Sequence, residues 1–450
     1  MNNWPYTPLS VFLQAREGRF KPNDPKIATY KRLEKIDFTG QIHISDKPSK
    51  TEMIIIESGD LVISGINVSK GALAVYEGRE PITATIHYSS YKFNKNKIDI
   101  AFLKRFLKSP TFRSELQEQV KGGIKTEIKP KHILQLKARI PDLSEQKKIN
   151  EYFNAIENEI ADLSTEVNNQ SAYLAKLRQA ILQEAIEGKL TAEWRKINPL
   201  RKGDPDYDAV ALLEKIKAEK ENLIMQGKIK KQIPIKPIKA DHVPFELPAG
   251  WVWTRLGDTL KNPPRNGYSP KEVTYETKVK SLKLGATTWG VFNPFEHKFI
   301  DENIPSNSDF WLKPNDILIQ RSNSIDYVGV TAIYTGKENE FIYPDLMMKL
   351  QIISPISVVY SQMVLSAPFN RDYFRKNAKG AQKSMPKINQ SIVNNTFFPI
   401  PPLAEQKIIV GQVEKLLSFV AELEQQVVER KVQTEQLMQA VLREAFAGSK

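Results

Sequence analysis

The chain has 450 residues, enough for two or three hydrophobic cores, and no cysteine, which excludes disulfides and thiolate-bound metals. Its five scattered histidines form no helical pair of the kind that a zinc protease needs, and no apolar run is long enough to cross a bilayer, so we expect a cytoplasmic protein without a membrane partner. The formal net charge of +13 permits a polyanionic partner, although many solvated surfaces are also basic.

Residues 1–139 predict a first globular domain. Apolar runs bounded by turn residues predict short strands at 53–56, 61–63 and 71–76. From Ile98 to Val120 the apolar spacing becomes helical, and a basic loop with two glycines follows at 121–126. We therefore expect a mixed α/β domain.

Residues 140–188 predict one long helix. Apolar side chains recur in alternating steps of four and three residues, which is the seam of a heptad coiled coil. Pro141 precedes the helix, Ser144 is a candidate N-cap, and Gly188 lies where a helix would stop. The apolar residues of this predicted seam are Ile149, Phe153, Ile156, Ile160, Leu163, Val167, Leu174, Leu177 and Ile181.

Residues 189–243 predict a further helix, from Asp206 to Gly227, and then a basic, proline-punctuated linker at 228–239. The lysines of this linker suit contacts with phosphate groups. We nevertheless interpret the segment as a solvated tether, because charge runs of this kind are usually solvated.

Residues 244–399 repeat the plan of the first domain. Asp316 with the apolar run after it corresponds to Asp60 with the run at 61–63, and Val328–Gly336 corresponds to Lys70–Gly78. The offset between matching positions drifts by a few residues, so loops changed length while the framework persisted. A constant framework with variable loops is typical of a recognition module.

Residues 400–450 repeat the long helix at a constant offset. Ile140–Lys147 returns as Ile400–Lys407, and Gln179–Ala185 returns as Gln439–Ala445, each 260 residues later. The constant offset indicates two rigid helices, which we expect to pair with each other in antiparallel fashion. The second predicted seam contains Ile409, Val413, Leu416, Val420, Leu423, Val427, Leu437 and Val441.

Charge is distributed unevenly along the chain. Residues 141–187 carry 4 basic and 9 acidic side chains, and residues 400–450 carry 6 and 7, so the positive charge lies outside the two helices. This separation suggests a polyanionic partner for the intervening domains and a protein partner for the helices.

We find no catalytic apparatus in the sequence. Asn262–Arg265 resembles the Asn-Pro-Pro-aromatic loop of amino-methyltransferases, but an arginine replaces the stacking aromatic and the chain has no Gly-x-Gly cofactor loop. Gly329–Gly336 has six residues between its glycines, whereas a phosphate loop has four. The acidic residues at 142 and 145 lie within one helix start, where they complement the helix dipole rather than form a nuclease site.

Two basic modules alternate with two matched heptad helices, each introduced by Ile-Pro-x-Leu-x-Glu-Gln-Lys, and this arrangement closely resembles the specificity subunits of type I restriction-modification systems. Residues 179–194 and 247–251 also match, and the resemblance covers essentially the whole chain. It implies an α+β fold in which two mixed α/β target-recognition domains are separated by two long helices that form an antiparallel coiled coil, as a pseudo-twofold internal repeat. The implied domains are a first recognition domain at 1–139, a first helix at 140–188, a helix and linker at 189–243, a second recognition domain at 244–399 and a second helix at 400–450.

The resemblance also implies a non-catalytic function in DNA recognition. Each recognition domain would read one half of a bipartite, asymmetric site in double-stranded DNA. The helices would set the spacing and dock two modification (methyltransferase) subunits, through which restriction (translocase) subunits join. No cofactor is expected in this chain, and S-adenosylmethionine is expected in the methyltransferase partner. A freestanding sequence-specific DNA-binding regulator with an internal coiled coil remains an open alternative.

We expect the basic loops of the two domains to contact DNA. Arginine, asparagine and glutamine can bond base edges in the major groove, whereas lysine more often contacts phosphate. The candidates are Arg16, Lys70, Lys121 and Lys125 in the first domain, and Arg265, Tyr268, Arg321, Asn323, Lys379, Gln382 and Lys383 in the second.

Overall fold

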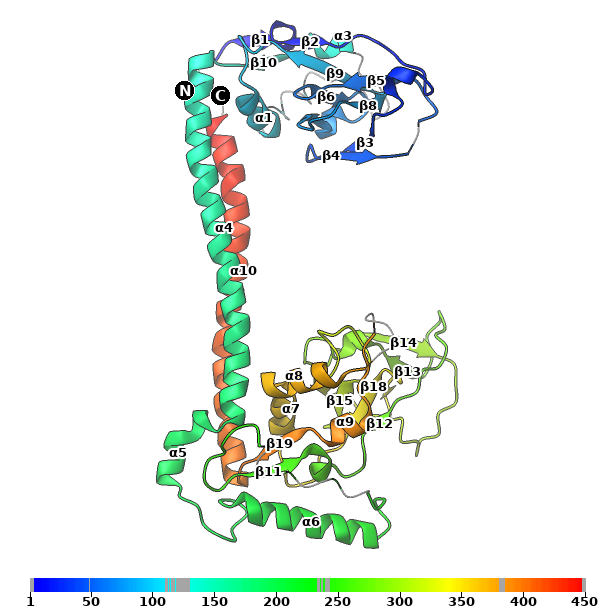
Figure 1. Cartoon of the computed structure of the whole chain (residues 1–450), viewed down its shortest axis with the longest axis vertical. Helices are drawn as coiled ribbons and strands as arrows, with labels where there is room; N and C mark the ends of the chain where they lie inside the picture. Colours follow the sequence, from blue (N-terminus) through cyan, green and yellow to red (C-terminus); the bar gives the residue numbers. More distant parts are fainter. Residues whose placement is uncertain are drawn as a thin grey trace. The chain divides into compact units, whose positions relative to one another are not determined.

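The computed structural model describes residues 4–47, 49–109, 112, 114, 118, 130–232, 235, 238, 243–379 and 385–446. The chain divides into two compact units: unit 1 comprises Met1–Gln170 and Gln426–Lys450, and unit 2 comprises Ser171–Gln425. Each unit contains a domain with several β-sheets and a part of both long helices (Figure 1). None of the helices in these described residues has the length and apolar character required to span a membrane.

Unit 1 contains two four-stranded sheets, ordered β2-β9-β6-β7 and β4-β3-β8-β5, and a two-stranded sheet, β1-β10. The strands are β1 Tyr6–Pro8, β2 Leu13–Ala15, β3 Arg32–Ile36, β4 Ile42–Ser45, β5 Met53–Ile56, β6 Leu61–Ser64, β7 Leu73–Val75, β8 Ile82–Thr85, β9 Tyr88–Phe93 and β10 Lys137–Arg139. The three predicted strands of this domain are therefore confirmed as β5, β6 and β7.

Strand β6 is an interior strand of its sheet, and both of its faces are apolar. Successive side chains of a strand point to opposite faces. Leu61 and Ile63 accordingly belong to one buried cluster, whereas Val62 between them belongs to another. All three side chains are buried.

Helix α1 (Ile100–Lys108) covers the first of these clusters. Asp99 caps it by accepting a hydrogen bond from the backbone N–H of Phe102, at 3.0 Å. Phe102, Leu103 and Phe106 form its buried face. Helix α1 ends at Lys108, and Ser109 after it is extended. Residues 112, 114 and 118 are again helical, so the helical pattern predicted to Val120 is interrupted at Ser109, and the other residues of 110–129 lie outside the described part of the chain.

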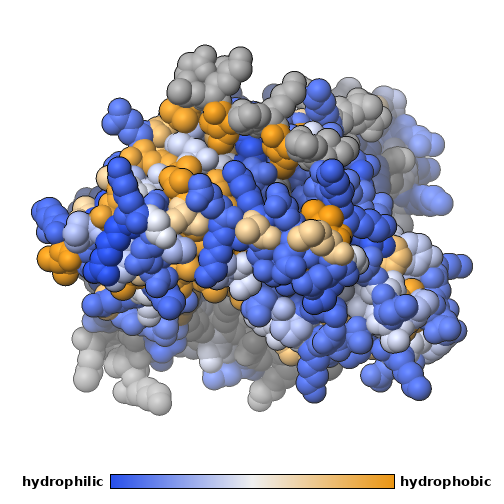
Figure 2. All heavy atoms as spheres, turned by 90° about the horizontal axis from the view of Figure 1, so that it is seen from below, coloured by the Kyte–Doolittle hydropathy of each residue, from blue (hydrophilic) through white to orange (hydrophobic). Residues whose placement is uncertain are grey.

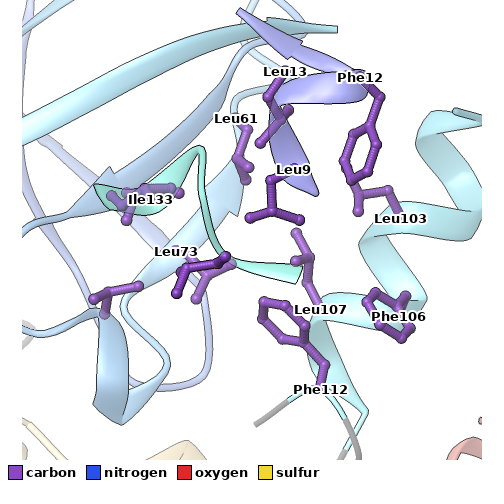
Figure 3. A pocket seen from close by; sticks show the side chains of 13 residues that line it. Leu9, Phe12, Leu13, Leu61, Leu73, Leu103, Phe106, Leu107, Phe112 and Ile133 are labelled. Carbon is purple, nitrogen blue, oxygen red and sulfur yellow. The ribbon is translucent and has the colours of Figure 1, made fainter. Parts of the chain in front are cut away.

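A small cavity of about 20 Å³ lies inside this core (Figure 3). Every residue that lines it is apolar, including Leu9, Leu73, Leu103 and Phe112. The volume suffices for about one water molecule, but the lining offers no hydrogen-bond partner, so the cavity is expected to be dry. We interpret it as a gap in the packing.

Unit 2 contains sheets ordered β12-β18-β15-β16, β14-β13-β17 and β11-β19. The strands are β11 Val252–Arg255, β12 Arg265–Asn266, β13 Val279–Leu282, β14 His297–Ile300, β15 Ile317–Gln320, β16 Thr331–Ile333, β17 Phe341–Ile342, β18 Met347–Leu350 and β19 Phe397–Ile400. Strands β12, β18, β15 and β16 correspond in order and pairing to β2, β9, β6 and β7 of unit 1, which confirms that the second domain repeats the plan of the first.

The shorter helices frame these sheets. They are α3 Pro130–Ile133, α5 Ala192–Ile197, α6 Ala209–Met225, α7 Val358–Ser366, α8 Pro368–Asn377 and α9 Gln390–Asn394, with 3-10 turns η1 Leu9–Val11, η2 Pro25–Ile27, η3 Val68–Lys70, η4 Lys189–Thr191, η6 Leu256–Thr259 and η7 Leu284–Ala286. Helix α6 is the helix predicted between the two halves. Figure 2 shows mainly hydrophilic side chains on the face seen from below, with hydrophobic ones interspersed.

The two long helices are continuous, as the sequence predicts: α4 spans Leu143–Ile186 and α10 spans Leu403–Ala445. The cap of α4 is Asp142 rather than Ser144, since Asp142 Oδ1 accepts the backbone N–H of Glu145 at 2.9 Å. Gly188 follows α4 with φ of +72°, a left-handed conformation that glycine adopts without strain.

Contacts within each unit confirm that α4 and α10 run antiparallel. In unit 1, Arg430 Nη1 donates to Gln170 Oε1 at 3.3 Å. In unit 2, Arg178 donates from Nε and Nη2 to the two carboxylate oxygens of Glu424, both at 2.7 Å. Each unit also shows the direction by itself: in unit 1 Phe153 stacks on Phe446, and in unit 2 Thr191, just after α4, bonds to Glu405. In both units, therefore, the residue number on α10 falls as the number on α4 rises, as in an antiparallel pair.

The heptad seam is mostly buried along one line, whereas four leucines of the other line are half exposed. Leu163, Leu177, Leu423 and Leu437 are 43–47% exposed. A two-stranded coiled coil normally covers both of its seam positions, so the helix pair leaves Leu163 and Leu437 open in unit 1 and Leu177 and Leu423 open in unit 2. We call these exposed seam leucines the open leucine strip. The buried seam residues are Phe153, Val167, Leu174, Ile181, Ile409, Val413, Val420, Val427 and Val441.

Candidate nucleic-acid interface

Each of the two β-sheet domains places a buried aspartate directly before its central strand, Asp60 before β6 and Asp316 before β15. Both carboxylates close the turn that leads into the strand. Asp60 Oδ2 accepts the backbone N–H of Glu57 at 3.0 Å, and Asp316 Oδ2 accepts that of Lys313 at 2.9 Å. The shared turn gives the two domains a common frame against which their side chains can be compared.

Arg16 and Arg265 occupy equivalent places in this frame. The backbone N–H of Arg16 donates to Ser90 O at 2.8 Å, and Arg265 pairs in register with Lys349. Ser90 and Lys349 stand opposite the second residue of β6 and of β15, respectively. Arg16 donates to both carboxylate oxygens of Asp60, one of them at 2.9 Å. Its guanidinium is therefore used to neutralise a buried charge.

In the second domain, Lys349 takes over the neutralising role. Its ammonium group lies 3.8 Å from the carboxylate of Asp316 and donates to Asp309 O at 2.7 Å and to Trp311 O at 2.9 Å. Burial lowers the pKa of Lys349 and raises the pKa of Asp316, because each site disfavours the charged form. Arg265 is thereby left at the surface, with its side chain 47% exposed.

Arg265 and Tyr268 lie against the same aromatic ring. The Arg265 guanidinium is 5.3 Å from the centre of the Phe310 ring and forms an ion pair with the exposed Asp309. The Tyr268 ring centre is 5.6 Å from that of Phe310, and the Tyr268 hydroxyl donates to Glu302 at 3.0 Å. That hydrogen bond to a carboxylate raises the pKa of Tyr268. The structure thus brings these two predicted contacts together.

Arg321, Asn323 and Lys379 are brought together on a second group of loops. Arg321 Nη1 donates to Asp345 O at 3.1 Å, and Asn323 Nδ2 donates to Gln320 Oε1 at 2.7 Å. Lys387 connects these segments, because its backbone forms isolated β-bridges with Ser322, which follows Arg321, and with Lys379. Lys387 is exposed, but it was not among the contacts predicted from the sequence. The one sequence signal that points to it is its position after a basic loop.

Five predicted contacts remain, three in unit 1 and two in unit 2. Lys70 is exposed at the end of η3, with its ammonium nitrogen 5.6 Å from the centre of the Phe38 ring. The other four candidates, Lys121, Lys125, Gln382 and Lys383, lie outside the described residues. All of these assignments as DNA contacts remain predictions.

The basic linker is not the free tether that we expected, at least over residues 228–232. Gln232 Nε2 donates to Lys261 O at 3.0 Å, which holds this end of the linker on the second domain. Lys220, on α6 just before the linker, donates to Gly257 O at 3.2 Å and to Asp258 O at 3.3 Å. Sequence reasoning missed this docking because it depends on hydrogen bonds to backbone carbonyls of a distant segment.

The repeated Glu-Gln motif attaches each domain to its long helix. Gln146 Oε1 accepts the backbone N–H of Asp99 at 2.7 Å, and Gln406 Oε1 accepts that of Ser357 at 2.9 Å. Asp99 and Ser357 are the N-caps of α1 and α7. The same glutamine therefore orients the first helix of each β-sheet domain, which explains why the motif occurs in both copies.

The glutamate of the motif behaves differently in the two copies. Glu405 is buried and accepts hydrogen bonds from Thr191 Oγ1 at 2.6 Å and Trp251 Nε1 at 2.7 Å, and it forms an ion pair with Arg195. The side chain of Glu145 has no hydrogen-bond or ion-pair partner among the described residues. Glu405 thus joins the segment after α4 to the start of α10 within unit 2.

No group of three or more acidic, histidine or cysteine side chains suitable for a metal ion occurs in the part of the chain that the structure describes. The site consists instead of exposed and half-buried arginine, lysine, tyrosine and asparagine side chains on loops and on β12. Such side chains can donate to phosphate oxygens and base edges.

No family model matches the chain. The type I restriction enzyme EcoEI specificity subunit of Escherichia coli is 29% identical over 248 residues, which cover 54% of this chain and 40% of the relative. The EcoBI specificity subunit of Escherichia coli is 34% identical over 316 residues, covering 69% of this chain and 57% of the relative. The chain thus spans roughly half the length of these two relatives.

The fold is also similar to that of a solved chain from a study of complex assembly and conformational transition in the type I restriction-modification system. The TM-score is 0.54, the sequence identity is 16%, and the match covers 99% of this chain and 98% of the other. At this identity the likeness establishes the fold.

Proposed function

We propose that this chain, which belongs to the family of type I restriction-modification specificity subunits, selects the DNA sequence on which such a system acts. In this proposal each recognition domain reads one half of a bipartite, asymmetric DNA site. The observation that carries it is the internal repeat: the same turn, sheet order and glutamine contact recur in both domains, while the surface residues differ. Two different readers on one framework suit an asymmetric site.

The long helices support a fixed spacing between the halves. A helix of 44 residues rises about 66 Å, at about 1.5 Å per residue. Duplex DNA repeats its groove about every 34 Å, so a stiff spacer would present the two readers at a defined helical phase. The length of the helices would then set the length of the unread spacer in the DNA site.

The open leucine strip supports docking of other subunits on the helices. In unit 1, the register that places Gln170 against Arg430 also brings Leu163 near Leu437, and both side chains are over 40% exposed. Exposed apolar side chains in a seam are a site for a further apolar helix. We assign this strip to the two modification subunits, which would carry S-adenosylmethionine and perform the methylation, and through which restriction subunits would join.

The proposal is tested by purifying the chain with and without its neighbouring gene products and measuring sequence-specific adenine methylation. Methylation only in the presence of the partner supports the proposal. Tight sequence-specific DNA binding by the chain alone, with no effect of partners, would favour a freestanding regulator. Methylation or cleavage by the chain alone would overturn a non-catalytic role.

Base reading is tested separately with Arg321→Ala in the complete complex. We expect weaker binding to cognate DNA and relaxed discrimination at one half-site only, because a side chain in one domain can read only that half. A typical base contact contributes about 1–3 kcal/mol of discrimination. Equal losses on cognate and random DNA would show that Arg321 contacts phosphate instead.

A further inference from the structure

A groove of about 1020 Å³ lies in unit 2 between the basic linker and the second recognition domain. One wall is formed by residues 227–232, and the other by residues 261–265, residues 306–309 and neighbouring side chains of the domain. The cationic side chains that line the groove are Lys228, Lys230, Lys231, Lys261, Arg265, Lys313 and Lys349.

The positive charge of the groove is only partly compensated within the protein, since Glu338 pairs with Lys313 and the buried Asp316 pairs with Lys349. Asp309 is the one acidic residue of the described lining, and it already forms an ion pair with Arg265. The ammonium groups of Lys228, Lys230 and Lys231 are exposed and have no hydrogen-bond or ion-pair partner among the described residues. Like charges held this close repel one another, and an anionic ligand would relieve that repulsion.

The wall that carries these lysines is held in place at both ends. Lys220 is bonded to two backbone carbonyls of η6, and burial lowers its pKa. Gln232 is bonded to the backbone of Lys261 on the opposite wall. A ligand that binds between these anchors therefore orders little additional chain, which reduces the entropic cost of binding.

The chemistry of the lining favours a polyanion over a small apolar ligand. Asn262, Ser308, Gln351 and Gln390 add polar groups to the lysines, whereas pockets for small organic ligands are mostly apolar. The groove also includes Arg265, the side chain that the second domain leaves at its surface. A strand of DNA in the groove would thus continue directly past a predicted reading residue.

We propose that this groove binds the phosphodiester backbone of the duplex DNA that the second recognition domain reads, with Lys228, Lys230 and Lys231 as phosphate contacts. This inference rests on the proposed function and extends it to a segment outside the recognition domains. The linker then contributes affinity that is independent of base sequence, and the recognition loops contribute specificity.

The test replaces all three lysines with glutamine (Lys228→Gln, Lys230→Gln, Lys231→Gln) in the complex of the full chain with its partner subunits. Binding constants for cognate and random DNA are measured over a range of salt concentrations. Each lost phosphate contact lowers the slope of log affinity against log salt by about 0.9, so we expect a decrease of about 2–3. The decrease should be the same on both DNAs, and the discrimination between them should be unchanged.

The matched control removes the same charge from unit 2 outside the groove, with Lys202→Gln, Lys215→Gln and Lys217→Gln. These lysines are exposed and do not line the groove. We expect a much smaller change in the salt slope. Equal changes in the two triple variants would overturn the inference, because the effect would then reflect net charge alone.

A second measurement separates DNA from an acidic protein partner. Chemical acetylation of the wild-type complex, read by mass spectrometry, should show that duplex DNA protects Lys228, Lys230 and Lys231. Protection by the partner subunits without DNA would assign the groove to an acidic protein segment and overturn the inference. If the wild-type complex binds its DNA site specifically and the triple variant shows the same affinity and salt slope, only this inference is overturned. If the wild-type complex shows no sequence-specific binding, the proposed function itself is contradicted.

Discussion

Arg430 donates a hydrogen bond to Gln170, at 3.3 Å, and these two residues occupy the same position in the two copies of the repeat. When two copies of the same helix pair antiparallel, there is one position of the repeat at which a residue faces the corresponding residue of the other copy. In this protein that position is polar. Polar residues in a coiled-coil seam fix the register at some cost in stability. The Gln170–Arg430 contact therefore marks the centre of the helix repeat and favours the observed alignment.

Replacing both residues with leucine should raise the stability of the helix pair and weaken its register. We expect thermal unfolding of the Gln170→Leu/Arg430→Leu variant to shift upward by about 2–4 °C for each kcal/mol gained. Calorimetry measures the shift, and cross-linking between the helices reports the register. A lower melting temperature in the double variant would contradict this role.

Glu405→Ala should destabilise unit 2 strongly. The substitution removes the carboxylate that pairs with Arg195, which keeps only its hydrogen bonds to Thr191 and Gly188, and leaves the indole N–H of Trp251 without its acceptor. Breaking a buried ion pair costs about 3–5 kcal/mol. Glu145→Ala is the matched control, since Glu145 is the same motif residue without such partners. Denaturant unfolding of both variants measures the difference, and equal losses would refute the assigned role of Glu405.

Arg16→Ala should lose more folding stability than Arg265→Ala, although the two arginines occupy equivalent positions in the repeat. Loss of Arg16 leaves the buried carboxylate of Asp60 without its cation, which we expect to cost about 3 kcal/mol. Arg265 pairs with an exposed aspartate, so its loss should cost under about 1 kcal/mol of stability. Unfolding experiments test the stabilities, and DNA binding should show the opposite order, with the larger loss of discrimination in Arg265→Ala.

The stability of unit 1 should depend on the ionisation of Glu157. Hydrogen bonds from Arg105 lower the pKa of this carboxyl below its ordinary value of 4.5. A depressed pKa in the folded state means that the stabilisation is complete above pH 4.5 and is lost as the pH falls through the folded-state pKa. The stability difference between the wild type and Glu157→Gln should accordingly be larger at pH 6 than at pH 3.

Denaturant unfolding at the two pH values measures this difference. Glu159→Gln serves as the control, because Glu159 is exposed on the same helix and has no partner among the described residues. A difference that does not change with pH would show that the Arg105 contact does not govern the ionisation of Glu157.

The open leucine strip should be needed for binding of the modification subunit. We expect Leu163→Gln with Leu437→Gln to weaken that binding at least tenfold, because about 1.4 kcal/mol corresponds to each factor of ten and two apolar contacts would be lost. Val428→Gln with Val432→Gln is the control, as these side chains are also exposed on the same helix pair but lie outside the seam. Calorimetric titration with the partner measures the affinity, and similar losses in both variants would contradict a specific role for the strip.

The long helices and the repeat could be predicted from the sequence because their signals are local and periodic. The heptads of α4 and α10 specify helices without reference to the rest of the chain, and a constant offset of 260 residues requires that nothing was inserted between the motifs. The strands β5 and β6 were predictable for the same reason. The sequence could not show that only one line of the seam would be buried, since that depends on how the two helices are rotated against each other.

The roles of individual charged side chains were decided by the tertiary structure. Arg16 and Arg265 look alike as basic loop residues, yet one neutralises Asp60, 44 residues away, and the other remains at the surface because Lys349 lies beside Asp316 instead. The linker lysines form one wall of a groove because the hydrogen bond from Gln232 to the backbone of Lys261 holds the linker against the second domain. The periodic pattern of the sequence determined the framework, whereas the partners that distant side chains find on folding determined which positive charges remain exposed at the surface.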